Sequence, residues 1–348
     1  MNRTKRIIFV MLTLLIASAL MAGCGFKKSD NIPAQQPPKK VSVGLLKLTS
    51  SAPLFIGIEK GFFQEQGLEL DVQWFDAAHP IAVATASNKI DVGATGITAS
   101  LFNMVAGGQQ LAIVADKGRE QEGYSSSAVV VKTSLWDQGI RRIEELKGKR
   151  IGITQTGSTY HYMIGRLLEE KNMSLQDVEL VPLGKVGAIL ASLQSGQVDA
   201  AILNEPNISK AVSEGYGKVV VQVGDVIDYQ TSAIFFSPQF MQDKETGIRF
   251  LKAYIKSCRY YYDAALQPPD KRSANYEEVI NTIAKYTGAP AADIKAGLPY
   301  IDRDGRLLSS DIQTQIDWYL KHKMIDKPID AAKVVNTSLW EEALKQLQ

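Results

Sequence analysis

Between Val41 and Phe236, short apolar runs alternate with segments of helical patterning. Strand–helix alternation of this kind indicates an α/β architecture with mainly parallel sheets. Helices are expected at Leu54–Lys60, Pro80–Ser87, Tyr160–Lys171 and Gly187–Gln194, and after Phe240 at Thr246–Ala265, Tyr276–Tyr286 and Ser309–Lys323. The expected strands are Val41–Leu46, Leu70–Phe75, Asp91–Ala94, Leu111–Ala115, Ala128–Val131, Ile151–Thr154, Val178–Val181, Ala200–Leu203, Val219–Val223 and Ala233–Phe236.

A weak internal sequence repeat, called the internal echo below, divides this α/β region into two parts. SNKIDVGA, which starts at Ser87, is matched about 108 positions later by SGQVDAAI, which starts at Ser195. In each copy a helix of small residues stops at Asn88 or Gly196, residue types that tolerate positive φ, and a strand follows. The spacing is too long for a solenoid repeat. It predicts two similar α/β lobes, in which Asp91 and Asp199 cap turns at strand edges.

The first residues have the pattern of an export signal. Arg3, Lys5 and Arg6 precede an apolar stretch from Ile7 to Gly23. A basic head, a short apolar core and small residues before a cut describe a secretory signal peptide. Cys24 directly follows Ala-Gly, which resembles a lipobox with Met at position 21 where Leu is usual. We expect residues 1–23 to be removed and Cys24 to carry a lipid that anchors the exported protein to the membrane.

The segment after Cys24 reads GFKKSDNIPAQQPPKK and is almost devoid of apolar residues. Such a composition cannot bury enough surface to order itself, so residues 24–40 are expected to form a disordered tether. With Cys24 lipidated, Cys258 is the one remaining thiol, which excludes an intramolecular disulfide and a cysteine-rich metal site. The formal charge of +2 falls to about −1 once the three basic residues of the signal are removed. We find no basic stripe for nucleic acid.

Three expected strand-to-helix turns are rich in small hydroxyl residues. They are Thr49–Pro53, Gly96–Ser100 and Thr156–Tyr160. In open α/β sheets, ligands bind beyond the carboxyl ends of strands, where helix N-termini offer free N–H groups and a positive dipole end. The turns therefore predict an anion site. Gly157 would let the backbone approach the ligand closely. The candidate ligand-binding residues from these turns are Ser50, Ser51, Gly96, Thr98, Thr156, Gly157, Ser158, Thr159 and Tyr160.

Four runs of the sequence resemble the solute-binding proteins of nitrate, sulfonate and taurine-type ABC importers, a group that includes thiamine-pyrimidine receptors. The runs are APLFIGIEKGFFQEQGLELD (Ala52–Asp71), IDVGATG (Ile90–Gly96), LKGKRIGITQTGST (Leu146–Thr159) and LQSGQVDAAILNEP (Leu193–Pro206). The resemblance implies a type II periplasmic-binding-protein fold, whose two α/β lobes are joined by two crossing segments and close on a ligand. Its partners would be a small-molecule ligand and a membrane permease.

The resemblance also places the boundaries and adds site residues. The crossings are expected near Ala128–Leu135 and Thr231–Pro238, so lobe one would hold residues 41–132 and 232–348, and lobe two residues 133–231. Glu205 and Pro206 match a Glu-Pro of the family. Asn204 stands where an aromatic residue is frequent, so it would hydrogen-bond the ligand rather than stack on it.

The ligand class is left open among small organic anions. Hydroxyl-rich turns suit a sulfonate or carboxylate head group, and an aromatic acid or a thiamine-pyrimidine precursor would fit if Tyr124, Tyr160 or Phe55 lined the cleft. The other cationic candidates near strand ends or turns are Lys47, Arg119 and Lys185, although a solvated surface position is the simpler interpretation of each.

Catalysis has little support in this sequence. The three histidines, His79, His161 and His322, are far apart and lack a nucleophile motif around them. GxSxG, Walker, HExxH and strand-linked GxGxxG motifs are absent. A pyrimidine-forming synthase on the same fold uses histidine with cofactor and iron, and a transcription regulator would need a DNA-binding helix pair at the N-terminus. We therefore expect a monomeric receptor without cofactor, metal or nucleic-acid partner, in which His161 could still reach the cleft.

Overall fold

A computed structural model describes residues 37–348. The expected signal peptide, Cys24 and most of the expected tether lie outside the described residues. The last two tether residues belong instead to the first strand, β1 (Lys39–Leu45), where Lys39 pairs with Leu68 of the neighbouring strand. Strands pair through their backbone, so an exposed strand end can consist of polar residues. For this reason a polar composition does not distinguish such an end from a tether. Within residues 37–348, no helix is long and apolar enough to cross a membrane.

The first sheet has the strand order β2-β1-β3-β10-β4. β1 is parallel to β2 and β3, whereas β10 is antiparallel to β3 and β4. The sheet is therefore mixed, and β10 is the reversed strand. Its other strands are β2 (Leu68–Trp74), β3 (Val92–Gly96), β4 (Ala112–Glu120) and β10 (Tyr229–Phe236).

The second sheet repeats this plan with the order β7-β6-β8-β5-β9. β6 is parallel to β7 and β8, and β5 is antiparallel to β8 and β9. The strands β5 and β8 are apolar and buried almost throughout, as expected for strands covered on both faces. The five strands are β5 (Ser127–Lys132), β6 (Arg150–Ile153), β7 (Glu179–Pro182), β8 (Ala200–Asn204) and β9 (Gly217–Gln222).

The chain passes between the sheets twice, each time just before the reversed strand. The first crossing, residues 121–126, joins β4 to β5, and the second, residues 223–228, joins β9 to β10. Both lie earlier than expected from the sequence. Ala128–Val131 is inside β5 of the second sheet, and Thr231–Phe236 is inside β10 of the first. The predicted positions of the crossings were therefore wrong. The sequence of an apolar strand does not show to which of two sheets the strand belongs. We use lobe one and lobe two for the first and second sheets with their helices.

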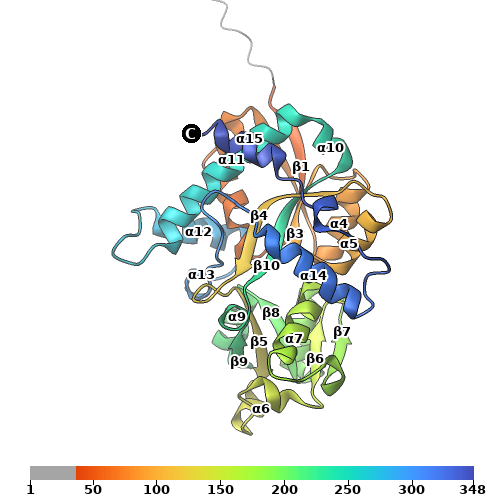
Figure 1. Cartoon of the computed structure of the whole chain (residues 1–348). Helices are drawn as coiled ribbons and strands as arrows, with labels where there is room; N and C mark the ends of the chain where they lie inside the picture. The colour runs from red at the N-terminus through yellow and green to blue at the C-terminus, as the bar shows by residue number, and fades with distance from the viewer. Residues whose placement is uncertain (1–36) are drawn as a thin grey trace, which may run out of the picture. The chain divides into compact units, whose positions relative to one another are not determined.

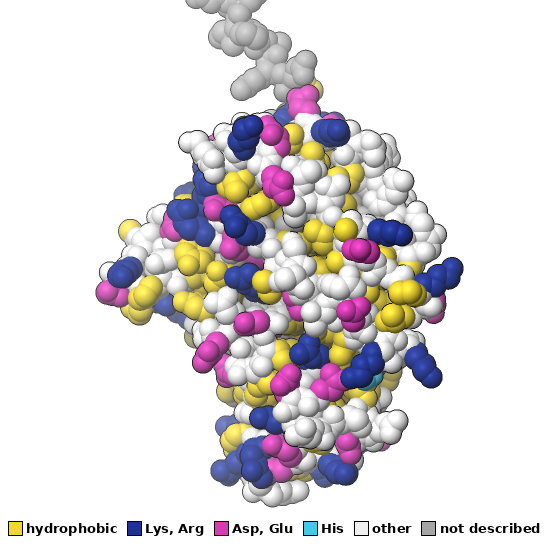
Figure 2. Space-filling model, in the orientation of Figure 1, with side chains coloured by type: hydrophobic (Ala, Val, Ile, Leu, Met, Phe, Trp, Pro, Cys, Tyr) yellow, Lys and Arg dark blue, Asp and Glu magenta, His cyan; other side chains and the backbone are white. Residues whose placement is uncertain are grey.

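Helices cover both sheets (Figure 1), and the predicted helices are confirmed with small shifts at their ends. The long helix α11 packs Phe250, Leu251 and Tyr254 into the apolar core of lobe one and ends in a π turn, Tyr262–Leu266. On the face shown in Figure 2, positive and negative side chains are interspersed. The helices are α2 (Ala52–Glu59), α3 (Phe62–Glu65), α4 (Ala78–Ala86), α5 (Ala99–Ala106), α6 (Thr133–Asp137), α7 (Thr159–Glu169), α8 (Val186–Ser195), α9 (Asn207–Ser213), α10 (Pro238–Gln242), α11 (Lys244–Tyr261), α12 (Tyr276–Thr287), α13 (Ala291–Ala296), α14 (Ser309–Lys321) and α15 (Ser338–Lys345).

The internal echo corresponds to equivalent positions in the two lobes. Asn88 and Gly196 both have positive φ, 57° and 81°, directly after α4 and α8. Asp91 accepts hydrogen bonds from the backbone N–H and hydroxyl of Ser42 at 2.8 and 2.7 Å. Asp199 accepts from the backbone N–H of Arg150 at 3.1 Å and from its guanidinium. Each aspartate directly precedes the central strand of its sheet, β3 or β8, and thus fastens the start of that strand to the neighbouring strand, β1 or β6.

Candidate functional site

A cavity of about 50 Å³ lies between the two sheets and is walled by both lobes. A water molecule needs roughly 10–15 Å³ of such space, so a group of only a few heavy atoms fits. Lobe one contributes Leu46, Leu48, Thr49, Ser50, Ala77, Ala78, Thr95, Gly96, Lys117, Gly118, Thr231 and Ser232. The first crossing and lobe two contribute Ser126, Thr154, Thr159, Tyr160, Val186, Asn204 and Glu205.

Several helices begin at this wall. α4 starts at Ala78, α7 at Thr159 and α8 at Val186, and a 3₁₀ turn over Thr49–Ser51 leads into α2. The first N–H groups of a helix lack partners within it, and the helix dipole places partial positive charge there. The wall therefore favours a negatively charged ligand before any charged side chain is considered.

Among the described residues, Lys117 is the one basic residue in the cavity wall. It is 1% exposed, and its ammonium donates to the Ser50 hydroxyl at 2.9 Å. An ammonium has three donors, and no other hydrogen bond or ion pair of Lys117 occurs among residues 37–348. Burial lowers the pKa of Lys117 to about 7, although the Asp116 charge opposes this shift. A buried cation with unused donors is costly unless an anion joins it.

Asp116 does not neutralise Lys117 directly. Its carboxylate accepts hydrogen bonds from the Gln230 amide at 2.6 Å and from the backbone N–H groups of Gly118 and Asp302 at 2.7 and 2.8 Å. Burial raises the pKa of Asp116 to about 6. Successive residues of a strand face opposite sides, so Asp116 holds lobe one together while Lys117 faces the cavity.

Two hydroxyl groups add unused hydrogen-bonding capacity to the wall. Thr95 is fully buried, and its Oγ1 has no hydrogen-bond partner among residues 37–348. Tyr160 is 3% exposed, and its hydroxyl also makes no hydrogen bond within the described part of the chain. Burial alone raises the pKa of Tyr160, so it remains a neutral donor. Buried polar groups are normally paired, so the buried, unpaired Thr95 hydroxyl is available to a ligand or water.

The carboxylate of Glu205 is not free, and the main chain of Glu205 contacts lobe one. Its carboxylate accepts from the backbone N–H and hydroxyl of Ser209 at 3.1 and 3.0 Å, at the start of α9. Its main-chain carbonyl accepts from the Thr49 N–H of lobe one at 3.2 Å. Burial raises the pKa of Glu205 to about 7, and the Asp293 charge adds to this. A largely protonated Glu205 leaves Lys117 as the main charge of the cavity below neutral pH.

A buried glutamate organises the first crossing. The Glu120 carboxylate accepts hydrogen bonds from the hydroxyls of Ser125, Ser126 and Ser127 and from the Ser126 backbone N–H. Ser127 in turn accepts from the Asn204 amide at 2.6 Å. Glu120 therefore fixes the path by which the chain enters lobe two, and it places Ser126 and Asn204 in the cavity wall.

Six of the eleven candidate ligand-binding residues from the sequence lie in the wall. They are Ser50, Gly96, Thr159, Tyr160, Asn204 and Glu205. The wall also contains polar residues that the sequence analysis missed, namely Lys117, Thr95, Thr154, Ser126, Thr231 and Ser232. Thr95 and Lys117 lie just beyond the ends of expected strands. A hydroxyl or charged residue that directly continues a buried apolar run is the sequence pattern that could have indicated them.

The structure does not bring Ser51, Thr98 or Thr156 to the cavity. The Ser51 hydroxyl donates to the Leu46 carbonyl at 3.0 Å, and the Thr98 and Ser100 hydroxyls are 2.9 Å apart. Thr156 is exposed to solvent. Small hydroxyl residues readily form hydrogen bonds with nearby parts of their own chain. Ser51 bonds in this way to a backbone carbonyl and Thr98 to a neighbouring hydroxyl.

Gly157 and Ser158 also lie outside the wall. The Ser158 hydroxyl caps α7 by accepting from the His161 N–H at 3.3 Å, and the Gly157 N–H donates to His161 Nδ1 at 3.1 Å. The Gly157 carbonyl accepts from the Ala99 N–H of lobe one at 2.9 Å. This turn therefore joins the lobes and begins α7, and burial lowers the pKa of His161 to about 4.

The other cationic and aromatic candidates are also outside the cavity. Lys47 and Lys185 are exposed, and Arg119 lies over the Tyr300 ring at 4.5 Å. The Tyr124 hydroxyl donates to a main-chain carbonyl of lobe one, and Phe55 is buried in the lobe-one core. The basic residue that does line the cavity is Lys117, two positions before Arg119.

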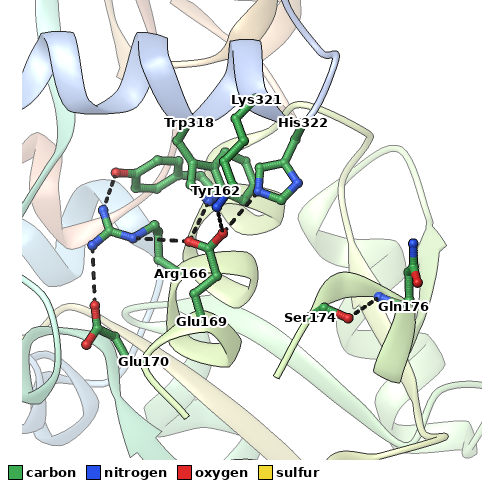
Figure 3. A network of polar contacts seen from close by, with 9 residues as sticks. All are labelled: Tyr162, Arg166, Glu169, Glu170, Ser174, Gln176, Trp318, Lys321 and His322. Carbon is green, nitrogen blue, oxygen red and sulfur yellow. Dashed lines mark hydrogen bonds and ion pairs between the residues drawn. The ribbon is translucent and has the colours of Figure 1, made fainter. Parts of the chain in front are cut away.

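The lobes are in contact around the cavity, as in a closed receptor. A Cβ on Gly96 would lie 2.6 Å from Thr159 Cγ2 across the boundary, so any larger residue would hold the lobes apart. α14 makes a second contact between the lobes (Figure 3). Its anchor in lobe one includes the hydrogen bond from Gln315 to the Gln230 carbonyl at 2.9 Å.

The far end of α14 surrounds Glu169 of α7 (Figure 3). Glu169 accepts from Trp318 Nε1 at 3.0 Å and Lys321 Nζ at 2.8 Å, and it lies 3.2 Å from His322 Nε2. Burial opposes ionisation of Glu169, but these donors outweigh it and its pKa is lowered. The Trp318 ring packs where a Cβ on Gly165 would lie, 2.3 Å from its nearest atom. We call the contacts of Glu169 with Trp318, Lys321 and His322 the α14 latch.

Two mixed sheets, each with one reversed strand reached through a crossing, and a polar cavity between them define a two-lobed periplasmic-binding-protein fold. The chain belongs to the NMT1-like family, whose model matches residues 34–276. A Bacillus subtilis (strain 168) protein named as an aliphatic sulfonates-binding protein is 24% identical over 345 residues, which is 97% of each chain.

Solved structures share the fold. The alkanesulfonate-binding protein SsuA from Xanthomonas axonopodis pv. citri, bound to MOPS, superposes with a TM-score of 0.71 at 18% identity and covers 86% of this chain and 98% of its own. The periplasmic nitrate-binding protein NrtA from Synechocystis PCC 6803 gives a TM-score of 0.70 at 16% identity and covers 89% of both chains. The expected fold class is confirmed.

Proposed function

We propose that this protein is an extracytoplasmic solute receptor that captures a small organic anion and delivers it to the permease of an ABC importer. The observation that carries the proposal is Lys117, a buried ammonium with unused donors in a cavity between two lobes. The names of its relatives, which bind sulfonates or nitrate, support the same class of ligand. The receptor performs no chemistry on the ligand.

The head group is a sulfonate or carboxylate in this proposal. Lys117 neutralises its charge, and the unpaired hydroxyl of Thr95 together with Tyr160, which also lines the cavity, completes its hydrogen bonds. A micromolar affinity corresponds to about −8 kcal/mol, which a shallow surface site rarely supplies to a small ligand. Enclosure between the lobes supplies it because the charge is paired in a dry cavity.

The cellular setting follows from the N-terminal sequence. Cys24 would be the lipidated first residue of a mature, monomeric protein that is anchored to the membrane and faces outward. A lipid anchor keeps the receptor close to its permease, and two or more acyl chains hold it stably.

Calorimetry tests the proposal on the full chain purified in mild detergent. The panel contains methanesulfonate, acetate, sulfate and nitrate, and the variants are Lys117→Met and, as a matched control, the exposed Lys47→Met. At least one anion should bind the parent and Lys47→Met, and its affinity should fall by about thirtyfold or more in Lys117→Met. Equal binding by Lys117→Met would exclude Lys117 as the anion anchor.

A further inference from the structure

The two crossings touch each other at Gly224, near the start of the second crossing. A Cβ on Gly224 would lie 2.6 and 2.8 Å from the backbone oxygen and nitrogen of Gln121, the first residue of the first crossing. Backbone atoms cannot turn aside as a flexible side chain does, so only glycine fits there without a shift of the chain. The Gly224 N–H also donates to the Ser125 hydroxyl of the first crossing at 3.0 Å. Packing and a hydrogen bond therefore join the two segments about which the lobes would rotate.

Ser125 connects this contact to the buried carboxylate of Glu120. Its hydroxyl donates to one oxygen of that carboxylate. The backbone N–H and hydroxyl of Ser126, both at 3.1 Å, and the hydroxyl of Ser127 donate to the carboxylate as well. A carboxylate offers about four acceptor sites and an amide oxygen about two, so an ionised side chain here can hold all four donors at once. Glu120 ends β4 and pairs with Tyr229, the first residue of β10, so it lies where both crossings meet lobe one.

The same carboxylate holds parts of the cavity wall. Ser126, which donates to it, lines the cavity, and so does Thr231, whose hydroxyl lies 3.5 Å from it. Ser127 extends the network by one step, because its hydroxyl accepts from the Asn204 amide at 2.6 Å and Asn204 lines the cavity. Three wall residues, from lobe one, the first crossing and lobe two, thus depend on one carboxylate for their position.

We propose that Glu120 is a positioning residue that couples the cavity to the hinge formed by the two crossings. Bending at the crossings moves Ser125 relative to Gly224, and the serines that hold the carboxylate move with it. The wall is then complete only in the closed arrangement, so an anion binds that arrangement more tightly and favours it. The inference rests on the proposed function, because it takes an anion in the cavity as given. Glu120, Ser125 and Gly224 lie outside the wall, so changes there act on a bound anion through this network.

A double-mutant cycle of Glu120→Gln and Ser125→Ala, measured by calorimetry on the full chain in mild detergent, tests the coupling. The probe is whichever of methanesulfonate, acetate, sulfate and nitrate binds the parent most tightly. Each single variant should weaken binding about fivefold, the effect of one hydrogen bond. The double variant should also lose about fivefold, rather than the about 25-fold of independent changes, because both substitutions break the same connection.

Two further variants complete the design. Asp91→Asn is the matched control, since Asp91 also accepts from a serine N–H and hydroxyl but directly precedes β3, whose other end forms part of the wall. It should bind the probe like the parent. Gly224→Ala tests the hinge side, because a Cβ there would part the crossings, and it should weaken binding by at least about fivefold. Urea unfolding of every variant ensures that affinities are compared between folded proteins.

The outcomes separate this inference from the proposed function. If Glu120→Gln and Ser125→Ala bind the probe like the parent, or if their effects multiply in the double variant, the coupling is overturned and the receptor stands. Parent-like binding by Gly224→Ala likewise overturns the link to the hinge. Absence of binding by all four anions to the parent overturns the anion receptor and this inference together.

Discussion

The Lys117 ammonium is bonded to the Ser50 hydroxyl at 2.9 Å, and this is its one hydrogen bond within residues 37–348. A neutral hydroxyl cannot compensate a buried charge as a carboxylate would. The unliganded protein therefore holds a destabilised cation at the centre of its cavity. Energy stored in this way is released when an anion binds, which links the stability of the empty receptor to its affinity.

Lys117→Met should consequently make the empty protein more stable while it weakens anion binding. Removing the buried charge at similar volume should raise the free energy of unfolding by on the order of 1–2 kcal/mol. Urea unfolding of parent and variant without ligand measures this difference. Lys47→Met, at an exposed site, should change the free energy of unfolding by less than about 0.5 kcal/mol. Destabilisation by Lys117→Met would mean that Lys117 has a structural partner in the folded protein.

Anion affinity should fall as pH rises above about 7. The pKa of Lys117 is about 7 in the folded protein, below its usual value of 10.5. A bound anion favours the charged ammonium, so it raises that pKa and binding takes up a proton above pH 7. For a sulfonate, which stays ionised, the dissociation constant should be flat below pH 7 and rise by up to about tenfold per pH unit above it.

Glu205 titrates near the same pH and acts in the same direction, because its ionisation above about pH 7 adds negative charge to the wall. Calorimetry of methanesulfonate between pH 6 and 9 on parent and Glu205→Gln separates the two groups. A slope that survives in Glu205→Gln belongs to Lys117. A flat profile in the parent contradicts a titrating lysine at the site.

Thr95→Val and Ser158→Ala should have opposite effects. Thr95 has an unpaired hydroxyl in the wall, so its loss should weaken binding about ten- to a hundredfold, the cost of one hydrogen bond to a charged group, without destabilising the protein. Ser158 caps α7 and lies outside the cavity, so Ser158→Ala should lower the free energy of unfolding by about 1 kcal/mol with little effect on affinity. Calorimetry and urea unfolding of both variants check the pair.

The strands were predictable because their side chains are apolar on at least one face, and all ten appear where the sequence places them. The C-terminal end of β4, residues 116–120, was not predicted as part of a strand. Asp116–Glu120 reads as a polar loop, yet four of these five residues are buried, because Asp116, Glu120 and Lys117 each find a partner or a cavity that only the folded chain provides. The amino-acid composition of a segment does not show that its charged residues will find such partners in the folded protein.

The site was predictable in kind but only partly in detail. The hydroxyl-rich turns after parallel strands include Ser50, Gly96 and Thr159, which lie in the cavity wall. Ser50 and Gly96 follow strands of the first sheet, and Thr159 follows β6 of the second. Thr231 and Ser232 come from β10, which returns antiparallel from the second crossing, so the rule for parallel strands did not include them. Lys117 and Arg119 are two residues apart and would share one face of a regular strand. The pairing of β4 with β10 is irregular between Asp116 and Gly118, and the sequence does not reveal such a bulge.

Changing Cys24→Ser should release the protein from the membrane or leave it uncleaved, because the serine hydroxyl cannot accept the lipid in place of the thiol. Fractionation of cells and the mass of the purified N-terminus measure both results. Membrane retention with residues 1–23 removed would contradict lipidation at Cys24. Cys258→Ser is the matched control, since the Cys258 thiol is buried in lobe one.

The α14 latch should favour the closed arrangement of the lobes. Trp318, Lys321 and His322 gather around one carboxylate, Glu169, across the boundary between the lobes (Figure 3). Glu169→Gln removes the charge and keeps the shape. Because the site is partly exposed to solvent, the loss should be about 1 kcal/mol, or roughly fivefold in the ratio of closed to open form. Apparent anion affinity should weaken by up to the same factor.

Small-angle scattering of the empty protein and calorimetry with ligand measure the two sides of this change. Glu169→Gln should have a larger radius of gyration without ligand and the parent value at saturation. Glu145→Gln breaks the exposed Arg142–Glu145 ion pair within lobe two and should match the parent in both measurements. Gly165→Ala should act like Glu169→Gln by a steric route, since a Cβ there would meet the Trp318 ring at 2.3 Å. If neither variant changes the radius or the affinity, α14 moves with lobe two and the latch does not control closure.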